Sequence, residues 1–322
     1  MVDHFPFKSA LVTGGGGFIG SHLVERLLKL NVKVTCLDNF SGGKMENIST
    51  YIDNPLLTVA KADITDYDGI VDLFKGIEIV FHQAVSKNSV CLINPRLDLR
   101  TNAEGTFNVL EASRTHGVKK IVHASTGSVY GEPRYVPEDE LHPTEPVSFY
   151  GTSKLAAEKY GMVFRQLYGM DVSVLRYFHV YGPRQEDNDY GGVVSIFIRR
   201  ALNGLPPIIF GDGSQIRSFT YVADVVKANL LVACSPAASG EIYNCASGLK
   251  IPIRRLADIV LEQLGRSDLR IQYSGWKPGD IKNFDISNDK IKNIGMSFDW
   301  DFEQGVAATV QWLRGKYGGQ AG

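Results

Sequence analysis

A tyrosine and a lysine stand four positions apart at Tyr150 and Lys154, in the run YGTSK. Residues at i and i+4 project from the same face of a helix, so the two side chains are expected side by side if this segment is helical. An ammonium beside a phenol favours the phenolate and is expected to lower the pKa of the tyrosine from about 10. The pair is therefore a candidate general acid and base for a hydroxyl group, although the same spacing also occurs in ordinary surface packing.

Two hydroxyl residues, Ser125 and Thr126, precede this pair in the run STGSVYG, directly after the apolar segment KKIVHA. The apolar segment predicts a buried strand, which would place both hydroxyls at its carboxyl end. The Thr126 hydroxyl is suited to bind a reacting oxygen in an oxyanion-type role. We therefore predict Thr126, Tyr150 and Lys154 as the catalytic residues.

The run TGGGGFIG places Gly14, Gly17 and Gly20 between a predicted strand over 10–13 and a predicted amphipathic helix. In this setting the first glycine permits a tight turn, the second lets the backbone approach a pyrophosphate, and the third allows close helix–strand packing. Asp38 follows Gly20 by 18 residues at the end of the second predicted strand. Its carboxylate can accept hydrogen bonds from ribose hydroxyls and would repel a 2′-phosphate. The sequence therefore predicts a dinucleotide site that prefers NAD to NADP.

Apolar runs alternate with helical patterns through the first 178 residues. Continuous apolar runs are typical of strands in a parallel sheet covered on both faces. Glycine, proline and polar residues then become more frequent, and from 249 the chain is irregular apart from a helix in IPIRRLADIVLEQLG. We predict an α/β protein with a Rossmann-type doubly wound parallel sheet over 1–178, to which 223–248 return. A smaller interleaved C-terminal α/β region is expected over 179–222 and 249–322.

Composition and charge exclude several other classes. The 34 Lys and Arg residues and 35 Asp and Glu residues give a net charge of −1, which argues against nucleic acid or anionic lipid as a partner. No apolar run reaches the length of a membrane helix, and the first residues lack the pattern of a secretory signal. The four cysteines and the seven histidines show no metal-ligand spacing. We expect a cytoplasmic protein without a metal site.

These motifs, in this order, resemble those of the extended short-chain dehydrogenase/reductase family, and within it the nucleotide-sugar 4-epimerases. The resemblance extends over nearly the whole chain, through TGGGGFIG, LDNFSGG, ADITD, FHQAVSKNSV, TNAEGTFN, STGSVYG, YGTSK, RYFHVYGPRQ, FGDGSQIRSFTYVADV and KPGDI. It implies NAD as the cofactor and a nucleotide sugar, in the first place a UDP-sugar, as the substrate. The C-terminal region would then bind the nucleotide sugar.

The resemblance also assigns site residues. The cofactor would be bound by the glycine loop, the ribose-binding turn, the adenine contact and the residues around the nicotinamide, namely Gly14, Gly17, Phe18, Ile19, Gly20, Asp38, Asn39, Phe40, Ser41, Gly42, Asp63, Ile64, Gln83, Ala84, Lys87, Asn102, Tyr150, Lys154 and Tyr177. The substrate would contact Lys87, Ser125, Thr126, Tyr150, His179, Val193, Arg217, Lys277, Asp280 and Phe284. Among these, Arg217 would bind the diphosphate, and Lys277 and Asp280 would close on the nucleotide.

Three positions depart from the family pattern. His179 stands where the family usually has an asparagine that contacts the substrate, and Lys277 replaces the usual arginine before PGD. Ser218 replaces the usual acidic residue after the arginine that binds the diphosphate. These departures leave the cofactor chemistry unchanged and affect the pocket for the sugar and the base.

The resemblance implies a carbohydrate isomerase that epimerises C4. Tyr150 would remove the proton of the 4-hydroxyl while C4 gives a hydride to NAD, and the 4-keto sugar would turn over and take the hydride on its other face. UDP-glucose and UDP-galactose are the favoured substrates, because Phe284 is bulky where relatives that admit a 2-acetamido group have a small residue. Helices over 98–116 and 150–169 would form the four-helix bundle of a homodimer.

Other functions stay open. The family also contains UDP-N-acetylhexosamine and UDP-uronate 4-epimerases, reductases and decarboxylating enzymes. A 4,6-dehydratase typically has an Asp–Glu pair beside the catalytic threonine, where this chain has Gly127 and Ser128. An NAD-sensing regulator without activity is the alternative from another class.

Overall fold

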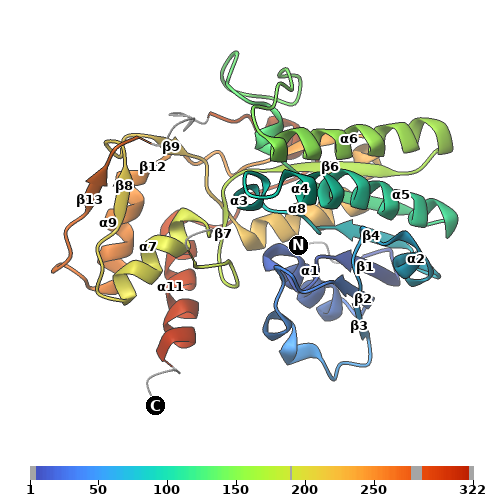
Figure 1. The fold of residues 1–322 in the computed structure, drawn as a ribbon, viewed down its shortest axis with the longest axis horizontal. Coiled ribbons are helices and arrows are strands. Elements are labelled where there is room, and N and C mark those ends of the chain that lie inside the picture. The colour runs from blue at the N-terminus through green and yellow to red at the C-terminus, as the bar shows by residue number, and fades with distance from the viewer. Residues whose placement is uncertain (1–4, 189–190, 277–284, 319–322) are drawn as a thin grey trace.

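Seven strands form one parallel sheet in the order β11–β6–β5–β4–β1–β2–β3 (Figure 1). The structure is a computed structural model and describes residues 5–188, 191–276 and 285–318. The strands of the sheet are β1 (Ser9–Thr13), β2 (Lys33–Asp38), β3 (Leu57–Lys61), β4 (Ile79–His82), β5 (Lys120–Thr126), β6 (Val172–Tyr177) and β11 (Ile242–Cys245). Their continuous apolar runs suit parallel strands that are buried on both faces. The predicted Rossmann-type doubly wound α/β fold is confirmed.

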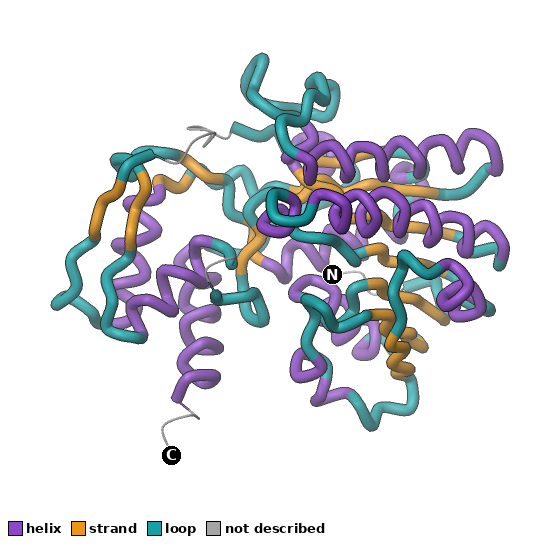
Figure 2. Tube along the Cα trace, in the orientation of Figure 1, coloured by secondary structure: helices purple, strands orange, loops and turns teal. Residues whose placement is uncertain are grey.

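Helices cover the sheet on both faces (Figures 1 and 2). On one face lie α1 (Phe18–Lys29) and α8 (Val222–Cys234), and on the other lie α5 (Gly105–Thr115) and α6 (Phe149–Tyr168). Successive side chains of a strand point to opposite faces. Val12 therefore belongs to the core under α1 and α8, and its neighbour Leu11 to the core under α5 and α6.

The strand order reverses between β1 and β4, which are adjacent in the sheet although β2 and β3 lie between them in the chain. The carboxyl ends of the strands meet at one edge, where Thr13 is in register with His82 and Thr126 with Tyr177. In open α/β sheets a ligand binds at such a switch point, outside the carboxyl ends of the strands. The glycine loop, which follows β1, and Thr126, which ends β5, therefore lie at the same edge of the sheet.

A second lobe lies beside this edge and has its own core. It contains β7 (Val180–Tyr181), α7 (Val193–Leu202), β8 (Ile208–Phe210), β9 (Ile216–Arg217), β10 (Thr220–Tyr221), β12 (Ile251–Pro252), α9 (Ile253–Leu264), β13 (Gln272–Ser274) and α11 (Phe302–Gly318). Ile198, Leu256 and Leu313 join α7, α9 and α11 in this core. The sequence analysis foresaw only α9 here, although Val194, Phe197, Ile198 and Ala201 give α7 an apolar face at helical spacing that could have indicated it.

The remaining helices are short. They are α2 (Tyr67–Ile70), α3 (Asn88–Cys91), α4 (Pro95–Leu99) and α10 (Asp289–Asn293), a π-helical turn over Arg100–Glu104, and 3₁₀ turns over Met45–Asn47, Ser49–Tyr51, Val71–Phe74, Gly127–Val129 and Pro236–Ala238. Within the described residues, no helix is long and apolar enough to cross a membrane, and no group of three or more His, Cys, Asp or Glu is arranged to hold a metal ion.

The helix expected over 98–116 is not continuous. It consists of α4, the π-helical turn and α5, and the turn carries Asn102. Asn102 is fully buried, and Thr106 donates a hydrogen bond to its carbonyl at 2.6 Å. A single π turn often marks a position where side-chain contacts override the helical repeat, and here those contacts belong to Asn102.

Candidate active site

A cavity of about 800 Å³ opens at the carboxyl edge of the sheet. Most of the predicted cofactor residues line it, together with the predicted substrate residue Ser125: Gly14, Gly17, Phe18, Ile19, Gly20, Asp38, Asn39, Ser41, Gly42, Asp63, Ile64, Gln83, Ala84, Lys87, Tyr150, Lys154 and Tyr177. Phe40, Asn102, Thr126, His179, Val193 and Arg217 are not among the lining residues. Lys277, Asp280 and Phe284 lie outside the described residues.

The glycine loop is shaped for close backbone approach. Gly14 has a φ of +64°, and a Cβ there would lie 2.8 Å from the backbone nitrogen of Ala84. A Cβ on Gly20 would lie 2.1 Å from the carbonyl oxygen of Gly14. Gly17 is the N-cap of α1 and makes no side-chain capping bond, so the first amides of the helix face the cavity. Such a helix N-terminus binds phosphate through its amides and its dipole, and these residues fit the pyrophosphate of NAD.

Asp38 is fixed at the end of β2, where it is only 6% exposed. Its two carboxylate oxygens accept hydrogen bonds from the amides of Gly16 at 2.9 Å and Phe40 at 2.7 Å. Burial raises the pKa of Asp38, and the two amides oppose that rise. The Phe40 ring packs against Gly16, where a Cβ would lie 2.7 Å away. Phe40 therefore supports the glycine loop, whereas Asp38 reaches the cavity.

The far end of the cavity carries Asn39, Asp63 and Ile64. Asn39 donates a hydrogen bond to Asp63 at 2.8 Å, and Asn108 donates one to the carbonyl of Ile64 at 2.9 Å. The first bond connects the turn after β2 with the turn after β3, and the second connects the turn after β3 with α5. The predicted adenine contact is thereby held next to the predicted ribose turn.

Tyr150 and Lys154 lie in the first turns of α6. Ser148 caps this helix by accepting a hydrogen bond from the amide of Gly151 at 3.0 Å. The i and i+4 spacing brings both side chains to the same cavity, as predicted. Thr126, at the end of β5, is hydrogen-bonded to the Tyr150 phenol. The structure thus brings the three predicted catalytic residues together.

The pKa of Tyr150 differs from the expectation. Burial raises it to about 12, and the hydrogen bond to Thr126 only partly opposes this rise. Burial also lowers the pKa of Lys154 to about 8, against the charges of Glu158 and Asp98. The loss of solvation is thus the largest cause of both pKa shifts in the protein alone. Oxidised nicotinamide, when bound, adds a positive charge that favours the phenolate.

A buried polar cluster supports the wall of the cavity near Tyr177. Asn229 on α8 donates to the Tyr177 hydroxyl at 2.8 Å, and Gln83 donates to the same oxygen at 3.2 Å. Asn229 was not foreseen, although it is a polar residue inside the apolar run VKANLLVAC. This polar residue within an apolar run was the signal in the sequence that could have indicated a buried polar contact.

Asn102 lies behind the cavity wall. Its side chain accepts a hydrogen bond from the amide of Ser86 at 2.8 Å, and donates to Asp98 at 2.9 Å and to Ser153 at 3.1 Å. It therefore joins the segment after β4 to α6. Any effect of Asn102 on cofactor binding would therefore act through these hydrogen bonds between the segment after β4 and α6.

The predicted substrate residues of the second lobe lie beyond the cavity. Arg217 is 8% exposed, and it donates to the carbonyl of Ile216 at 2.9 Å. Burial and the charge of Arg217 lower the pKa of His179 to about 3. Ser218 is hydrogen-bonded to His179 through its backbone, so two of the three departures from the family pattern meet beside Arg217. Val193 begins α7 and packs against the core of the second lobe.

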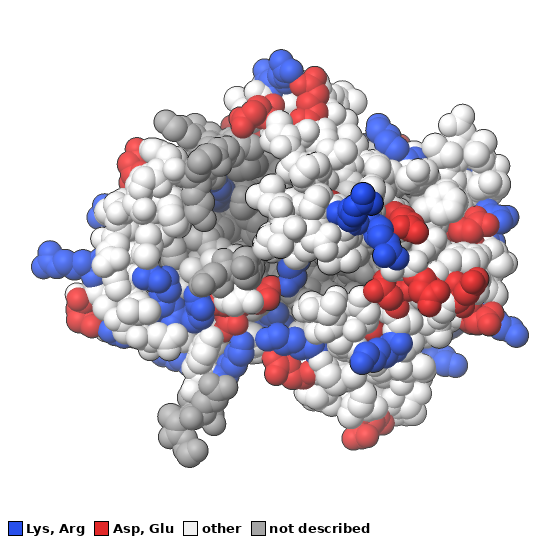
Figure 3. All heavy atoms as spheres, viewed as in Figure 1, with Lys and Arg blue, Asp and Glu red and all other residues white. Residues whose placement is uncertain are grey.

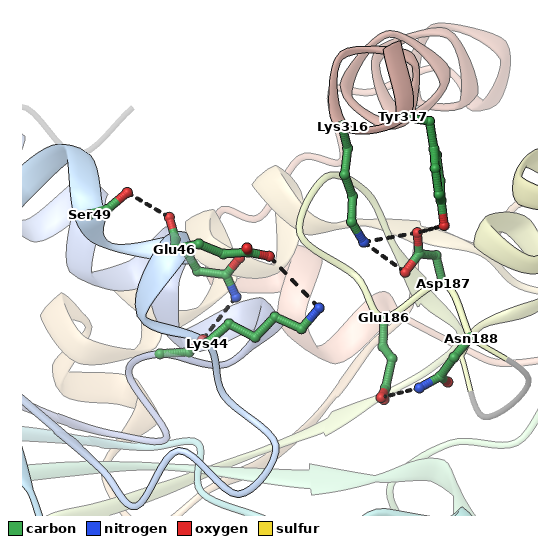
Figure 4. Close-up of polar contacts among 10 residues, drawn as sticks. Lys44, Glu46, Ser49, Glu186, Asp187, Asn188, Lys316 and Tyr317 are labelled. Atoms are coloured by element: carbon green, nitrogen blue, oxygen red, sulfur yellow. Dashed lines mark hydrogen bonds and ion pairs between the residues drawn. The ribbon is translucent and has the colours of Figure 1, made fainter. Parts of the chain in front are cut away.

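Charged residues connect the two lobes at the mouth of the cavity. Lys87 forms an ion pair with Glu186, and Arg184 forms one with Glu25 on α1. Asp187 accepts hydrogen bonds from Lys316 at 2.9 Å and from the Tyr317 hydroxyl at 2.7 Å, both on α11 (Figure 4). Glu186 and Lys316 line the cavity and were not foreseen, because nothing in their local sequence distinguishes them from exposed charges.

The comparisons with known proteins agree with this geometry. The model of the NAD-dependent epimerase/dehydratase family matches residues 10–246. A protein of Methanocaldococcus jannaschii, provisionally named a UDP-glucose 4-epimerase, is 41% identical over 309 residues, which cover 94% of this chain and 98% of that protein.

Two solved structures resemble the whole chain. The UDP-glucose 4-epimerase of Thermotoga maritima with UDP-glucose has a TM-score of 0.90 and 36% identity, covering 96% of this chain and 99% of that one. The UDP-N-acetylglucosamine 4-epimerase of Methanobrevibacter ruminantium M1, in complex with UDP-N-acetylmuramic acid, has a TM-score of 0.91 and 36% identity, with the same coverage.

Proposed function

The chain belongs to the NAD-dependent epimerase/dehydratase family, and from that premise we propose that it interconverts UDP-glucose and UDP-galactose at C4. It is an NAD-dependent enzyme, as its family is. The observation that carries the proposal is that Tyr150 and Lys154 line the same cavity as the glycine loop and Asp38, with Thr126 hydrogen-bonded to the Tyr150 phenol. Acid–base residues and a dinucleotide cradle in one cavity are what a reversible oxidation of a sugar hydroxyl requires.

In the proposed mechanism, Tyr150 removes the proton from the 4-hydroxyl, and Thr126 binds the same oxygen. NAD, held by the glycine loop and Asp38, would supply the acceptor for the hydride of C4 and the donor that returns it. Lys154 favours the phenolate of Tyr150 by its charge and binds the ribose next to the nicotinamide. After the 4-keto sugar has turned over, Tyr150 returns the proton to the oxygen.

The segment after Thr126 favours an epimerase over a 4,6-dehydratase. A Cβ on Gly127 would lie 2.2 Å from the ring of Phe178, which is itself buried. An acidic side chain beside Thr126 would therefore need Phe178 to move. The position directly after Thr126 therefore offers no acid for the proton transfers at C5 and C6 that a dehydratase needs.

The decisive test is product analysis with a panel of nucleotide sugars. We expect purified protein to interconvert UDP-glucose and UDP-galactose without net NADH in solution, because the hydride is borrowed and returned. Tyr150→Phe should lower the rate by at least about 10²-fold, the scale of acid–base catalysis. NADH accumulating in step with turnover would identify a dehydrogenase instead, and no turnover of any sugar would favour an NAD-sensing regulator.

A UDP-N-acetylhexosamine 4-epimerase is the second candidate, favoured by the likeness to the Methanobrevibacter ruminantium enzyme. Phe284→Ser separates the two candidates. If Phe284 limits the space at C2, the variant gains kcat/KM mainly for UDP-N-acetylgalactosamine. A wild type that already prefers the acetamido sugar would reject the UDP-hexose assignment.

We also propose the roles of the two regions and the homodimer that the sequence analysis predicted. Residues 1–178 and 223–248 would bind NAD, and 179–222 and 249–322 would bind the nucleotide sugar. Two copies would associate through α5 and α6, and the protein would work in the cytoplasm.

On the face seen in Figure 3, acidic and basic side chains are interspersed, which suits neither nucleic acid nor a membrane surface as partner.

A further inference from the structure

Glu158 is a buried carboxylate that the proposed mechanism does not use. It lies one turn beyond Lys154 on the inner side of α6, and its side chain is 1% exposed. Arg176 on β6 binds it with two hydrogen bonds, at 3.0 Å from Nε and 2.8 Å from Nη2. The guanidinium lies 4.6 Å from the centre of the Tyr130 ring, and the Tyr130 hydroxyl donates to Asn244 at 2.7 Å. A buried, bidentate pair of this kind fixes the carboxylate in one orientation.

Glu158 also contacts the active site itself. Ser125 lines the cavity, and its hydroxyl donates a hydrogen bond to the Glu158 carboxylate. Ser125 therefore presents only its lone pairs to the cavity and can accept a hydrogen bond there. Without this carboxylate, the Ser125 hydroxyl would be free to rotate.

Among the described residues, the negative charges of Glu158 and of Asp98 on α4 work against the lowering of the Lys154 pKa by burial. Asp98 is buried and accepts a hydrogen bond from Asn102 at 2.9 Å. His82 on β4, His123 on β5 and Tyr150 on α6 are further titratable groups near Lys154. Burial lowers the pKa of both histidines, so they are neutral and add no positive charge beside Lys154.

We propose that Glu158 is a positioning residue, which orients the Ser125 hydroxyl and holds the positive charge of Lys154 beside Tyr150. Arg176 makes this arrangement possible by holding the carboxylate in one orientation with two hydrogen bonds. Glu158 touches neither the cavity nor the reacting atoms. The inference deepens the proposed function and rests on it for the role of Tyr150.

The test is a titration of Tyr150 in the NAD-loaded protein without sugar. The phenolate absorbance of Tyr150 is obtained by subtracting the same protein carrying Tyr150→Phe. Lys154→Met gives the midpoint expected when the neighbouring charge is lost. The positive charge of bound NAD is expected to bring the titration of Tyr150 below that of Lys154. We then expect Glu158→Gln to raise the midpoint by about one pH unit toward the Lys154→Met value, because Lys154 loses its proton at lower pH once Glu158 is neutral. In the Lys154→Met background, Glu158→Gln should cause no further rise.

Two control variants separate charge from packing. Glu158→Asp keeps the charge and should leave the midpoint near that of the wild type. Ser125→Ala removes the bond to the hydroxyl and should lower kcat for UDP-galactose without moving the midpoint. If Glu158→Gln does not fold, the double variant Glu158→Gln/Arg176→Gln, which removes both buried charges together, takes its place in the same comparison.

An unchanged midpoint in folded Glu158→Gln or in the double variant, or an equal rise when Lys154 is already replaced, would overturn the inference. Since the titration contains no sugar, it decides the role of Glu158 even if UDP-galactose is not a substrate. If UDP-galactose is turned over, the alkaline limb of kcat should also move about one pH unit lower in Glu158→Gln.

Discussion

Asp38 combines two roles at the end of β2. Its oxygens hold the amides of Gly16 and Phe40, and the residue also lines the cavity. The glycine loop is thus tied to the same carboxylate that would meet the ribose. A phosphate on that ribose would approach a buried negative charge, which is costly.

The corresponding prediction concerns cofactor choice. Asp38→Asn keeps an acceptor for the Phe40 amide but removes the charge, so it should weaken NAD binding by about 10-fold or more, as expected for a charged hydrogen bond. Binding of NADP should weaken less or improve. Calorimetric titration of both cofactors measures the ratio, with Asp63→Asn as the matched carboxylate control. Equal affinity of the wild type for NAD and NADP would contradict the assignment of Asp38 to the ribose.

For single residues, the sequence predicted the location of a side chain better than its pKa or its hydrogen-bond partners. The spacing of Tyr150 and Lys154 and the setting of the glycines were sufficient to place these residues in one cavity. The direction of the Tyr150 pKa was not predictable, because it depends on how completely neighbouring segments bury the phenol. Asn102 shows the same limit, since only the tertiary structure reveals that its amide is used by Ser86, Asp98 and Ser153.

At the scale of elements, α6 faces the active site on its inner side and carries exposed apolar side chains on its outer side. Its inner side carries Lys154 and Glu158, whereas Val163 and Leu167 on its outer side are 45% and 66% exposed. Phe107 on α5 adds another exposed apolar side chain, and its ring lies 5.4 Å from that of Tyr160 on α6. Adjacent exposed apolar residues of this kind mark an association surface.

The prediction is a dimer that a charge on this surface dissociates. Leu167→Glu should give a monomer at micromolar concentration, because it would bury a carboxylate in an apolar interface. Sedimentation velocity measures the change, and Leu205→Glu, at a 50% exposed residue of the second lobe, is the matched control. A wild type that sediments as a monomer would refute association through α5 and α6.

Elements were predictable where their pattern is local. The strands of the sheet and α6 have continuous apolar or helical patterns, and the sequence analysis placed them. The apolar residues of α11 become interpretable only when they meet α7 and α9 in the second core. The π-helical turn has no local signature, since it arises from bonds that Asn102 makes with distant segments.

At the scale of the whole molecule, the fold buries histidines that the unfolded chain would protonate. Burial lowers the pKa of His22 to about 4 and of His82 to about 3, and it also lowers the pKa of His123 and His179. A histidine whose folded pKa lies below about 6.5 binds its proton more readily in the unfolded chain. Stability is therefore unaffected above about pH 7 and falls as the pH drops below 6.5.

Several buried carboxyl groups work in the opposite direction, because burial raises the pKa of Asp38, Asp98, Glu138, Glu140 and Asp224. The pKa of Glu138 rises to about 7, with a contribution from Asp285, so the folded protein takes up this proton earlier than the unfolded chain does. Protonation of Glu138 therefore adds stability as the pH falls from about 7 to 4.5. Each buried histidine costs about 1.4 kcal/mol for every pH unit below 6.5 until its folded pKa is reached.

His123 offers the sharpest test of this account. Its ring stacks on His82 at 5.1 Å, and neither of its nitrogens has a hydrogen-bond partner among the described residues. His123→Leu fills a similar volume without a buried, unpaired polar ring, so it should stabilise the protein at pH 8 by about 1 kcal/mol or more. At pH 5 the gain should be larger by about 2 kcal/mol, because the unfolded variant no longer takes up that proton. Urea unfolding of both proteins at the two pH values measures the difference, and His116→Leu, at the C-cap of α5, serves as a control for hydrophobic gain alone. A gain of equal size at both pH values would mean that His123 does not contribute to the loss of stability in acid.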